Sequence, residues 1–360
     1  MNKKAACLVM LVSFMAYTLY AQSVDDFQWV RHGNSITIIG YVGTDMNVRI
    51  PLQIQGMPVT AIDDYAFDGN NLTSIVIPDS VTSIGNRAFR NSQLNSVTIG
   101  NGVTSIGREA FRNTRLTSLT IPDSVRTIGD RWAGDTFRDS HLTSVTIGSG
   151  ITEISNGAFA NNRLTSITIP DSVTSIGGSA FANNQLSNAI IPVSVTYIEA
   201  FAFYRNQLTN ITIPDSVTSI GGEAFANNQL TNVTIGNSVT QISGGAFRNN
   251  RLTGITIPNS VTCIGEPMIR GLATFAGNQL SSITIGNGIR SLDYRVFIFR
   301  GIWGTSNSIT NLSQITIGAN VELNASSDAV WRGIRAAYEA NGRMAGTYTL
   351  IDGRWNFQPR

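Results

Sequence analysis

The sequence predicts an elongated, β-rich repeat solenoid, and three observations favour it. A leucine recurs along most of the chain, and most steps between these leucines are 22 residues long. Each leucine opens the pattern Leu-x-x-Ile-x-Ile, in which apolar and polar residues alternate as in a strand with one buried face. Only 13% of the 360 residues are charged, whereas 42% are hydrophobic and 34 are glycine, a composition that argues against a disordered chain and against a long coiled coil.

The apolar positions of one unit, residues 164–185, explain the fold through burial. Three of them lie on the strand, two on the return arm, and one fills the centre of the coil: Leu164, Ile167, Ile169, Val173, Ile176 and Phe181. One coil cannot bury these side chains from water by itself, so neighbouring coils must stack at the strand spacing of about 4.7–4.9 Å. The eleven recurring leucines predict eleven coils: Leu72, Leu94, Leu116, Leu142, Leu164, Leu186, Leu208, Leu230, Leu252, Leu280 and Leu312.

A short polar residue stands three positions after the phenylalanine of each coil, and only Asn, Ser or Thr occurs there. Such side chains bond backbone groups that curl inward at a turn, so a stacked polar ladder is expected. The residue after the strand alternates between Pro and Gly and ends the strand. The ladder positions are Asn70, Ser92, Thr114, Ser140, Asn162, Asn184, Asn206, Asn228, Asn250 and Asn278.

The consensus unit is Leu-Thr-x-Ile-x-Ile-Pro-x-x-Val-Thr-x-Ile-Gly-x-x-Ala-Phe, and it closely resembles the BspA-like, or treponemal-type, leucine-rich repeat over residues 67–318. The segment Gly40–Thr60 looks like a degenerate first unit of such proteins. The resemblance implies an exported bacterial surface protein, because relatives are associated with adhesion to host extracellular-matrix proteins and with coaggregation. Near the end of the coil, where the family often has Cys, this chain has Asn, Gln or Arg.

The start of the chain reads as an export signal. Lys3 and Lys4 precede an apolar run from Ala5 to Leu19, and the small residue Ala21 follows. No later stretch reaches the roughly 18 continuous apolar residues of a membrane span. We therefore expect an exported protein without a transmembrane span, at the cell surface or secreted, with the periplasm as the alternative location.

Removal of this leader also changes the charge and the cysteine count. Without Lys3 and Lys4, the basic and acidic side chains number 23 each, and every basic one is Arg. A neutral chain argues against a general nucleic-acid binder. Cys263 would be the one remaining thiol, so no internal disulfide is expected.

Both open ends of the solenoid need covers. At the first end, Phe27–Val30 and Ile36–Ile39 predict a hairpin. At the other end, Ser327 is expected to cap a helix that runs to Asn341 and buries one face, and a hairpin with its turn at Asp352-Gly353 follows. The predicted face comprises Val330, Trp331, Ile334, Ala337 and Tyr338. The predicted regions are a signal peptide (1–21), an N-terminal cap with a degenerate repeat (22–66), the solenoid (67–318) and a C-terminal cap (319–360).

We expect no catalytic residue, metal site or cofactor. Nearly every Ser, Thr, Asp and Asn is copied once per coil, which makes a structural role the simpler explanation. Only His32 and His141 could act as bases near neutral pH, and His141 occupies a turn position held elsewhere by Gln or Arg. The Pro-Asp aspartates come from every second coil, about 9–10 Å apart, too far to share one calcium ion. They are Asp79, Asp123, Asp171 and Asp215.

The outward strand positions form a uniform, uncharged face. One row is Ser or Asn, as at Ser118 and Asn210, and the next row is mostly Thr, as at Thr120 and Thr212. Two readings stay open: a solvated sheet of β-favouring residues, or a regular hydroxyl array that binds a repetitive surface such as glycan or ice.

Insertions into the repeat predict edge loops with contact residues. The first insertion carries Trp132, the second carries Met268 and Leu272, and the third carries Phe299 and Trp303. Side chains of these types are enriched at interfaces. The alternative is that the loops pack on their own coils.

Arginines mark a second candidate contact surface. Arg90, Arg112 and Arg138 share one repeat position in successive coils, which predicts a basic strip along one edge of the N-terminal half. Such a strip would attract sulfated glycans or acidic proteins, and the alternative is an ordinary solvated face. Four aspartates are expected to neutralise part of it: Asp123, Asp130, Asp135 and Asp139.

A third contact candidate is the aromatic patch Tyr197, Phe201 and Tyr204, in a coil that lacks the usual small residues. Together these features predict a non-enzymatic binding or adhesion protein whose partners are host matrix proteins or surface proteins of other cells, with glycans as a further ligand class. The rival prediction is a structural or periplasmic envelope protein without a specific ligand. The oligomeric state stays open.

Overall fold

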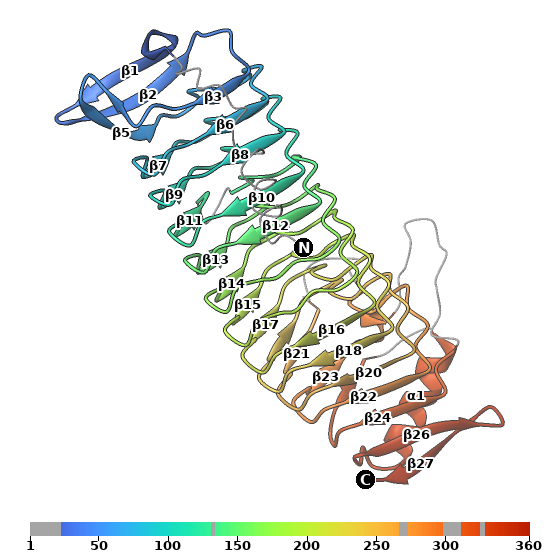
Figure 1. Cartoon of the computed structure of the whole chain (residues 1–360). Helices are drawn as coiled ribbons and strands as arrows, with labels where there is room; N and C mark the ends of the chain where they lie inside the picture. Colours follow the sequence, from blue (N-terminus) through green and yellow to red (C-terminus); the bar gives the residue numbers. More distant parts are fainter. Residues whose placement is uncertain (1–22, 131–133, 266–272, 298–310, 325–327) are drawn as a thin grey trace, which may run out of the picture.

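The structure, a computed structural model, describes residues 23–130, 134–265, 273–297, 311–324 and 328–360. The predicted signal peptide therefore lies outside the described residues. The chain winds into a long rod of stacked coils, with one cap at each end (Figure 1). Most coils contribute one strand to each of two parallel ladders, so the predicted leucine-rich-repeat solenoid is confirmed.

The first ladder, which we call the strand face, is built from the Leu-x-x-Ile-x-Ile segments. Neighbouring strands pair parallel and in register, so that Ser118 faces Ser144 and Ile121 faces Ile147. Between β12 and β16 the ladder narrows to a single bridge, Thr168 to Ile190. Its strands are β3 (Asn47–Arg49), β6 (Ser74–Val76), β8 (Ser96–Thr98), β10 (Ser118–Ile121), β12 (Ser144–Ile147), β16 (Asn210–Ile213), β18 (Asn232–Ile235), β20 (Gly254–Ile257), β22 (Ser282–Ile285) and β24 (Gln314–Ile317).

The second ladder, the return ladder, is shorter per coil and equally regular: Ile176 pairs with Ile154 on one side and with Ile198 on the other. Cys263 lies half-buried in this ladder. Its strands are β5 (Met57–Ile62), β7 (Ser83–Ile84), β9 (Ser105–Ile106), β11 (Thr127–Ile128), β13 (Glu153–Ile154), β14 (Ser175–Ile176), β15 (Tyr197–Ile198), β17 (Ser219–Ile220), β19 (Gln241–Ile242), β21 (Cys263–Ile264), β23 (Ser291–Leu292) and β25 (Glu322–Leu323).

The core is organised by a column of phenylalanine rings, one per coil, as the sequence predicts. Consecutive ring centroids are 4.9 to 5.9 Å apart, and their planes deviate from parallel by 20° or less. Tyr41 meets the first ring at 6.0 Å, and Trp331 meets the last at 6.3 Å, so both caps contact the column. The column is Phe67, Phe89, Phe111, Phe137, Phe159, Phe181, Phe203, Phe225, Phe247, Phe275 and Phe297.

The predicted polar ladder is confirmed from Asn162 to Asn278, where each asparagine joins two coils, whereas the buried Thr114 hydroxyl in the N-terminal part makes no hydrogen bond. The Asn206 Nδ2 donates to the Phe181 carbonyl of the preceding coil at 2.9 Å and to the Phe203 carbonyl of its own coil at 3.2 Å. Its Oδ1 accepts from the Leu186 amide at 3.1 Å. The side chain therefore satisfies three buried backbone groups at once.

Close approach between coils explains individual glycines after the strand. A Cβ added at Gly148 would collide with the Pro122 carbonyl of the preceding coil. The same clash arises at Gly236 against Pro214. The alternation of Pro and Gly is not strict, because Pro170, Pro192 and Pro214 follow one another in successive coils.

The N-terminal cap is a hairpin, as predicted, which extends the return ladder. It comprises β1 (Phe27–His32) and β2 (Ser35–Tyr41), and β2 also pairs in parallel with β5. A short strand, β4 (Gln53–Ile54), and a one-turn helix, η1 (Val24–Asp26), complete this end.

The C-terminal cap closes the strand face. Helix α1 (Ala329–Ala340) buries Trp331, Ile334 and Tyr338, and β26 (Gly346–Ile351) pairs antiparallel with β24 and with β27 (Arg354–Pro359). The predicted helix end and hairpin are confirmed. The cap residue differs: Asp328, whose side chain accepts from the Trp331 amide at 2.9 Å, occupies the N-cap position in place of Ser327. Within the repeat region, a second one-turn helix, η2 (Tyr294–Val296), follows β23.

Candidate functional site

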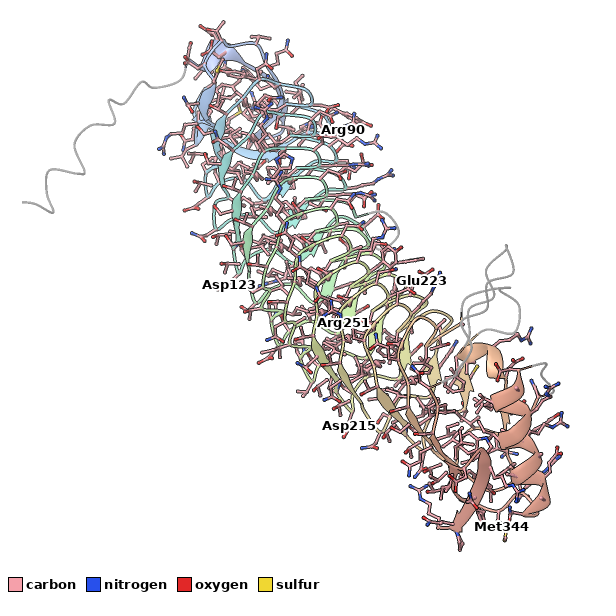
Figure 2. The ribbon with its side chains drawn as sticks, turned by 90° about the vertical axis from the view of Figure 1, so that its right-hand side faces the viewer. Arg90, Asp123, Asp215, Glu223, Arg251 and Met344 are labelled. Atoms are coloured by element: carbon pink, nitrogen blue, oxygen red, sulfur yellow. The ribbon has the colours of Figure 1, made fainter. Side chains whose placement is uncertain are left out.

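The structure brings the three predicted arginines together, whereas the contact residues of the insertion loops lie outside the described residues. Arg90, Arg112 and Arg138 come from successive coils and line one edge of the rod, which we call the arginine edge. Figure 2 shows Arg90 and Glu223 on this edge, with Asp123 and Asp215 on the opposite one. Five other predicted contact residues lie outside the described residues: Trp132, Met268, Leu272, Phe299 and Trp303.

Left-handed turns create the arginine edge. Glu109 and Asn113 have positive φ angles of 53° and 56°, and Asn91 has one of 57°. Two such residues per coil turn the chain sharply on both sides of the buried Phe111, so that Arg112, which follows it, projects outward. Asparagine suits these turns because it tolerates the left-handed region better than most residues.

The centre of the arginine edge is a carboxylate that sequence reasoning missed. The Glu109 side chain is only 5% exposed, and Arg87 and Arg108 each approach it to 3.0 Å. Arg90 and Arg112 lie at 3.6 Å from it. Alignment of the coils could have revealed this contact, because Glu109 stands one 22-residue period after Arg87 and equivalent positions of adjacent coils lie side by side.

The hydrogen bonds from Arg87 are the main reason why the pKa of Glu109 is lowered from 4.5 to about 2, and they outweigh the cost of burial. The carboxylate is therefore ionised under all ordinary conditions. Because it accepts hydrogen bonds from Arg87 through both oxygens, it holds the guanidinium in a fixed plane.

Further carboxylates convert the predicted basic strip into a mixed ion-pair ladder. Asp68 accepts from Arg90 at 2.7 and 3.1 Å. Asp135 and Asp139 each contact both Arg112 and Arg138 at 3.2 to 3.6 Å. The expected neutralisation by these last two aspartates is thus confirmed.

The expected contribution of Asp123 to this neutralisation was wrong. Asp123 lies on the opposite edge (Figure 2), where its carboxylate accepts from the Ser149 amide of the next coil at 2.7 Å. Asp79 and Asp215 make the same contact to Asn101 and Asn237. The Pro-Asp aspartates therefore tie turns together, and the described residues contain no group of three His, Cys, Asp or Glu side chains arranged to hold a metal ion.

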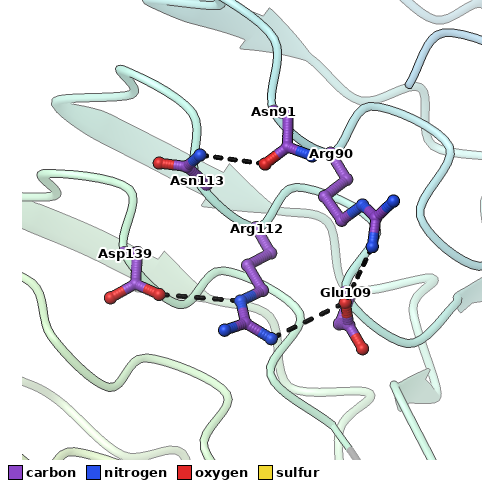
Figure 3. Close-up of a pocket in the computed structure, with 6 residues that line it drawn as sticks. All are labelled: Arg90, Asn91, Glu109, Arg112, Asn113 and Asp139. Carbon is purple, nitrogen blue, oxygen red and sulfur yellow. Dashed lines mark hydrogen bonds and ion pairs between the residues drawn. The ribbon is translucent and has the colours of Figure 1, made fainter. Parts of the chain in front are cut away.

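A shallow hollow of about 470 Å³ opens on the arginine edge, lined by Arg90, Asn91, Glu109, Arg112, Asn113 and Asp139 (Figure 3). Arg112 contacts its three carboxylates only at 3.6 Å. Its guanidinium therefore has N–H groups that can engage a carboxylate or sulfate of a ligand in two-pronged geometry. The partly exposed guanidinium of Arg112 suits the hollow to binding an anionic group.

The low pKa of Glu109 predicts a pH-dependent stability. The arginines bind the ionised carboxylate, so its stabilisation is complete above about pH 4.5 and is lost as the pH falls through about 2. We expect Glu109→Gln to lower the free energy of unfolding by roughly 2 kcal/mol at neutral pH. Urea unfolding of both proteins between pH 7 and pH 2 checks this, and a difference that stays constant down to pH 2 would contradict it.

The third predicted contact candidate lies on the return ladder and the adjoining turn. Tyr197 is 55% exposed and Phe201 is 38% exposed, and Tyr204 lies half-buried near Phe201.

No helix among the described residues is both long and apolar enough to cross a membrane.

Comparison with known proteins identifies the repeat family. The model of the BspA type leucine rich repeat region matches residues 60–187 and 174–302. A comparison with curated proteins gave no match. Leucine-rich repeat solenoids are typically scaffolds for protein interaction, since stacked repeats present extended binding surfaces.

The chain is similar to several solved structures, and the one with a TM-score above 0.5 shows the same fold. The pneumococcal vaccine antigen PcpA is 20% identical with a TM-score of 0.53, over 89% of this chain and 96% of that one. A leucine rich cell surface protein from Faecalibacterium prausnitzii is 25% identical with a TM-score of 0.42, over 85% and 95%. The T. pallidum leucine rich repeat protein is 22% identical with a TM-score of 0.38, over 72% and 90%. With its stacked 22-residue coils and a family match from residue 60 to residue 302, this chain belongs to the BspA-type leucine-rich repeat family.

Proposed function

We propose that this chain is an exported, non-enzymatic protein that binds other proteins at the bacterial cell surface and serves adhesion to host matrix proteins or to other cells. The observation that carries the proposal is the family match over residues 60–302. The leader pattern around Lys3 and Lys4 supports export. The repeated polar residues are engaged in stacking, as Asn206 is, which leaves the edges of the rod to make contacts.

The contacts that we propose are the arginine edge and the insertion loops carrying Trp132 and Trp303. In the hollow, Arg112 has the least tightly bound guanidinium and stands beside two amide side chains, Asn91 and Asn113. Acidic segments of proteins fit this arrangement best, and sulfated glycans share the same anionic chemistry. Binding through such surface charges weakens as salt rises.

A second candidate function is a structural role in the periplasm or envelope without a specific ligand. The uniform, uncharged strand face favours it, because repeat proteins that read one ligand usually diversify such a surface. Protease treatment of intact cells separates the two locations. Cleavage on intact cells supports a surface protein, whereas protection until lysis would overturn the adhesion proposal in favour of the structural one.

The contact sites are tested with the purified chain on a panel of immobilised matrix proteins. We expect Arg112→Ala to weaken binding about tenfold, as for an arginine at the centre of an interface. Arg251→Ala is the matched control, because Arg251 is also an exposed arginine but lies in a distant coil (Figure 2). Equal affinities of both variants and the wild type would remove the arginine edge from the proposal, and the pair Trp132→Ala and Trp303→Ala tests the loops in the same assay.

A further inference from the structure

One coil, residues 186–207, departs from its neighbours at several outward positions. Tyr197 and Phe201, which are 55% and 38% exposed, replace the smaller or polar residues found one period before and after: Ser175 and Ser219 for the first, Ser179 and Glu223 for the second. Tyr204 likewise replaces the alanines at 182 and 226. We call Tyr197, Phe201 and Tyr204 the aromatic cluster.

Phe201 is costly to folding in two ways. Its φ angle of 62° places it in the left-handed region, which is unfavourable for a bulky side chain. Its ring is also left partly in water, so the folded chain gains little apolar burial in return. The neighbouring coils place Ser179 and Glu223 at the same position, also with positive φ, and the next coil places Gly245 there. A residue that is unfavourable for the isolated coil indicates a role in contact with another molecule.

Two members of the cluster, Phe201 and Tyr204, are held in a defined geometry. The rings of Phe201 and Tyr204 meet edge to face with centroids 5.5 Å apart, and the Arg205 guanidinium lies 5.2 Å from the centre of the Tyr204 ring. Arg205 replaces the asparagine that links neighbouring coils elsewhere, as Asn183 bonds Asn161 at 2.8 Å. Tyrosine and arginine in ordered positions are the residue types that dominate the energy of protein interfaces.

The surroundings have the anatomy of an interface. Several adjoining outward positions are small and uncharged, as at Ser175, Ser179 and Ser219. Three charged residues stand around the rings: half-buried Glu199 between Tyr197 and Phe201, where it accepts from the Gly178 amide at 3.0 Å, exposed Arg205 after the cluster in the same coil, and half-buried Glu223 beside Phe201 in the next coil. An aromatic centre, small uncharged neighbours and a charged rim are typical of protein interfaces.

We propose that the aromatic cluster is the contact surface of a homodimer, in which a second copy of this chain covers it around a twofold axis. The surface carries one arginine, Arg205, and two glutamates, of which Glu199 is bonded to the preceding coil and Glu223 faces the next one. A twofold rotation through the cluster sets Arg205 of each copy opposite Glu223 of the other. The chain without Lys3 and Lys4 has no net charge, so long-range repulsion between copies is absent. This inference does not depend on the proposed adhesion function.

The location of the cluster fits a crossed dimer. Residue 201 lies near the middle of the repeat region, so both ends of each rod and the hollow at Arg112 stay outside the contact. The other strongly exposed apolar residues of this coil, Ile190 and Val193, lie on the strand face and on its adjoining turn. They are not part of the proposed surface, so Ile190 provides a control.

Sedimentation equilibrium of the purified chain tests the proposal. The wild type is expected to be a dimer, and the triple variant Tyr197→Ser, Phe201→Ser and Tyr204→Ala, which restores the residues of adjacent coils, is expected to dissociate at least about 100-fold more readily. Ile190→Thr should leave the dimer unchanged. A wild type that stays monomeric, or a triple variant that stays dimeric, would overturn the proposal.

A charge exchange tests the twofold arrangement and does not rely on the aromatic residues. Arg205→Glu places two negative groups opposite each other and should weaken the dimer about tenfold. Combining it with Glu223→Arg restores opposite charges across the axis and should recover most of the affinity. If the double variant is as weak as the single one, the proposed pairing is wrong.

Discussion

Replacing Phe203 with alanine is expected to lower the free energy of unfolding by about 3–5 kcal/mol. The side chain is fully buried, and its ring stacks on Phe181 at 5.4 Å and on Phe225 at 5.3 Å. Removing it opens a cavity between two coils that cannot collapse, because strands on both sides fix the coil spacing. Urea unfolding followed by far-ultraviolet circular dichroism measures the effect.

Phe201→Ala provides a matched control for this prediction. It removes the same side chain two residues earlier in the same coil, but that ring is 38% exposed and sits at a positive φ. The expected change is within about 0.5 kcal/mol when both proteins are unfolded as monomers, at concentrations below the dissociation constant of the proposed dimer. Similar losses in the two variants would mean that the phenylalanine column is not the main source of the stability of the coil.

The position of Phe203 gives its loss a further consequence. Each coil of a solenoid contacts only its neighbours, so the stability of the rod is approximately a sum of coil and interface contributions. Weakening a central coil should uncouple the two halves, and the unfolding transition should broaden or split. The same substitution at Phe67, beside the N-terminal cap, should leave a single transition.

The sequence predicted those features that every coil repeats. Ile167 and Ile169 alternate with polar residues, which assigns one side of the strand to the core, and Phe181 recurs with the same period and must fill that core. Asn184 was expected to bond backbone groups because only short polar residues occur at its position in the turn. Burial of a periodic pattern has one solution, which is to stack the coils in register. Repetition therefore predicted the fold, the column and the polar ladder together.

What differs from one coil to the next was harder to predict. The neutralisation of the arginine edge depends on Glu109, whose side chain meets arginines of two coils only after the turns have set its direction. The placement of Asp123 on the other edge depends on the turn after the strand. Both features depend on the direction in which a turn points an outward side chain. The repeat period shows which residues point outward, but it contains no information about which of them meet.

Asn206→Ala is expected to lower the free energy of unfolding by about 3 kcal/mol. The side chain is 6% exposed and bonds two carbonyls and one amide. Alanine leaves these three backbone groups without their partner, and each unsatisfied buried group costs about 1–3 kcal/mol, offset in part by relaxation. Urea unfolding measures the loss, and exposed Asn188 on the strand face supplies the control, where alanine should change stability by less than about 0.5 kcal/mol.

Asn206→Asp distinguishes loss of hydrogen bonds from loss of volume, because the two side chains have nearly the same shape. The carboxylate still accepts from the Leu186 amide, but it cannot donate, and it faces the carbonyl oxygens of Phe181 and Phe203 at the distances now bridged by N–H groups. We expect the free energy of unfolding to fall by about 5 kcal/mol at neutral pH, more than for alanine.

The aspartate variant should also depend on pH. Burial and the two carbonyls raise the pKa of this carboxyl above its unfolded value of about 3.9, so the folded state holds the proton more tightly. The deficit relative to the wild type should therefore shrink as the pH falls from the raised folded-state pKa toward about 4, since the protonated acid again donates one hydrogen bond, and it should level off below about 4, where the unfolded chain is protonated as well. The deficit of the alanine variant should not change with pH. If aspartate is tolerated as well as alanine at neutral pH, packing volume and not the donor pair is what the ladder contributes.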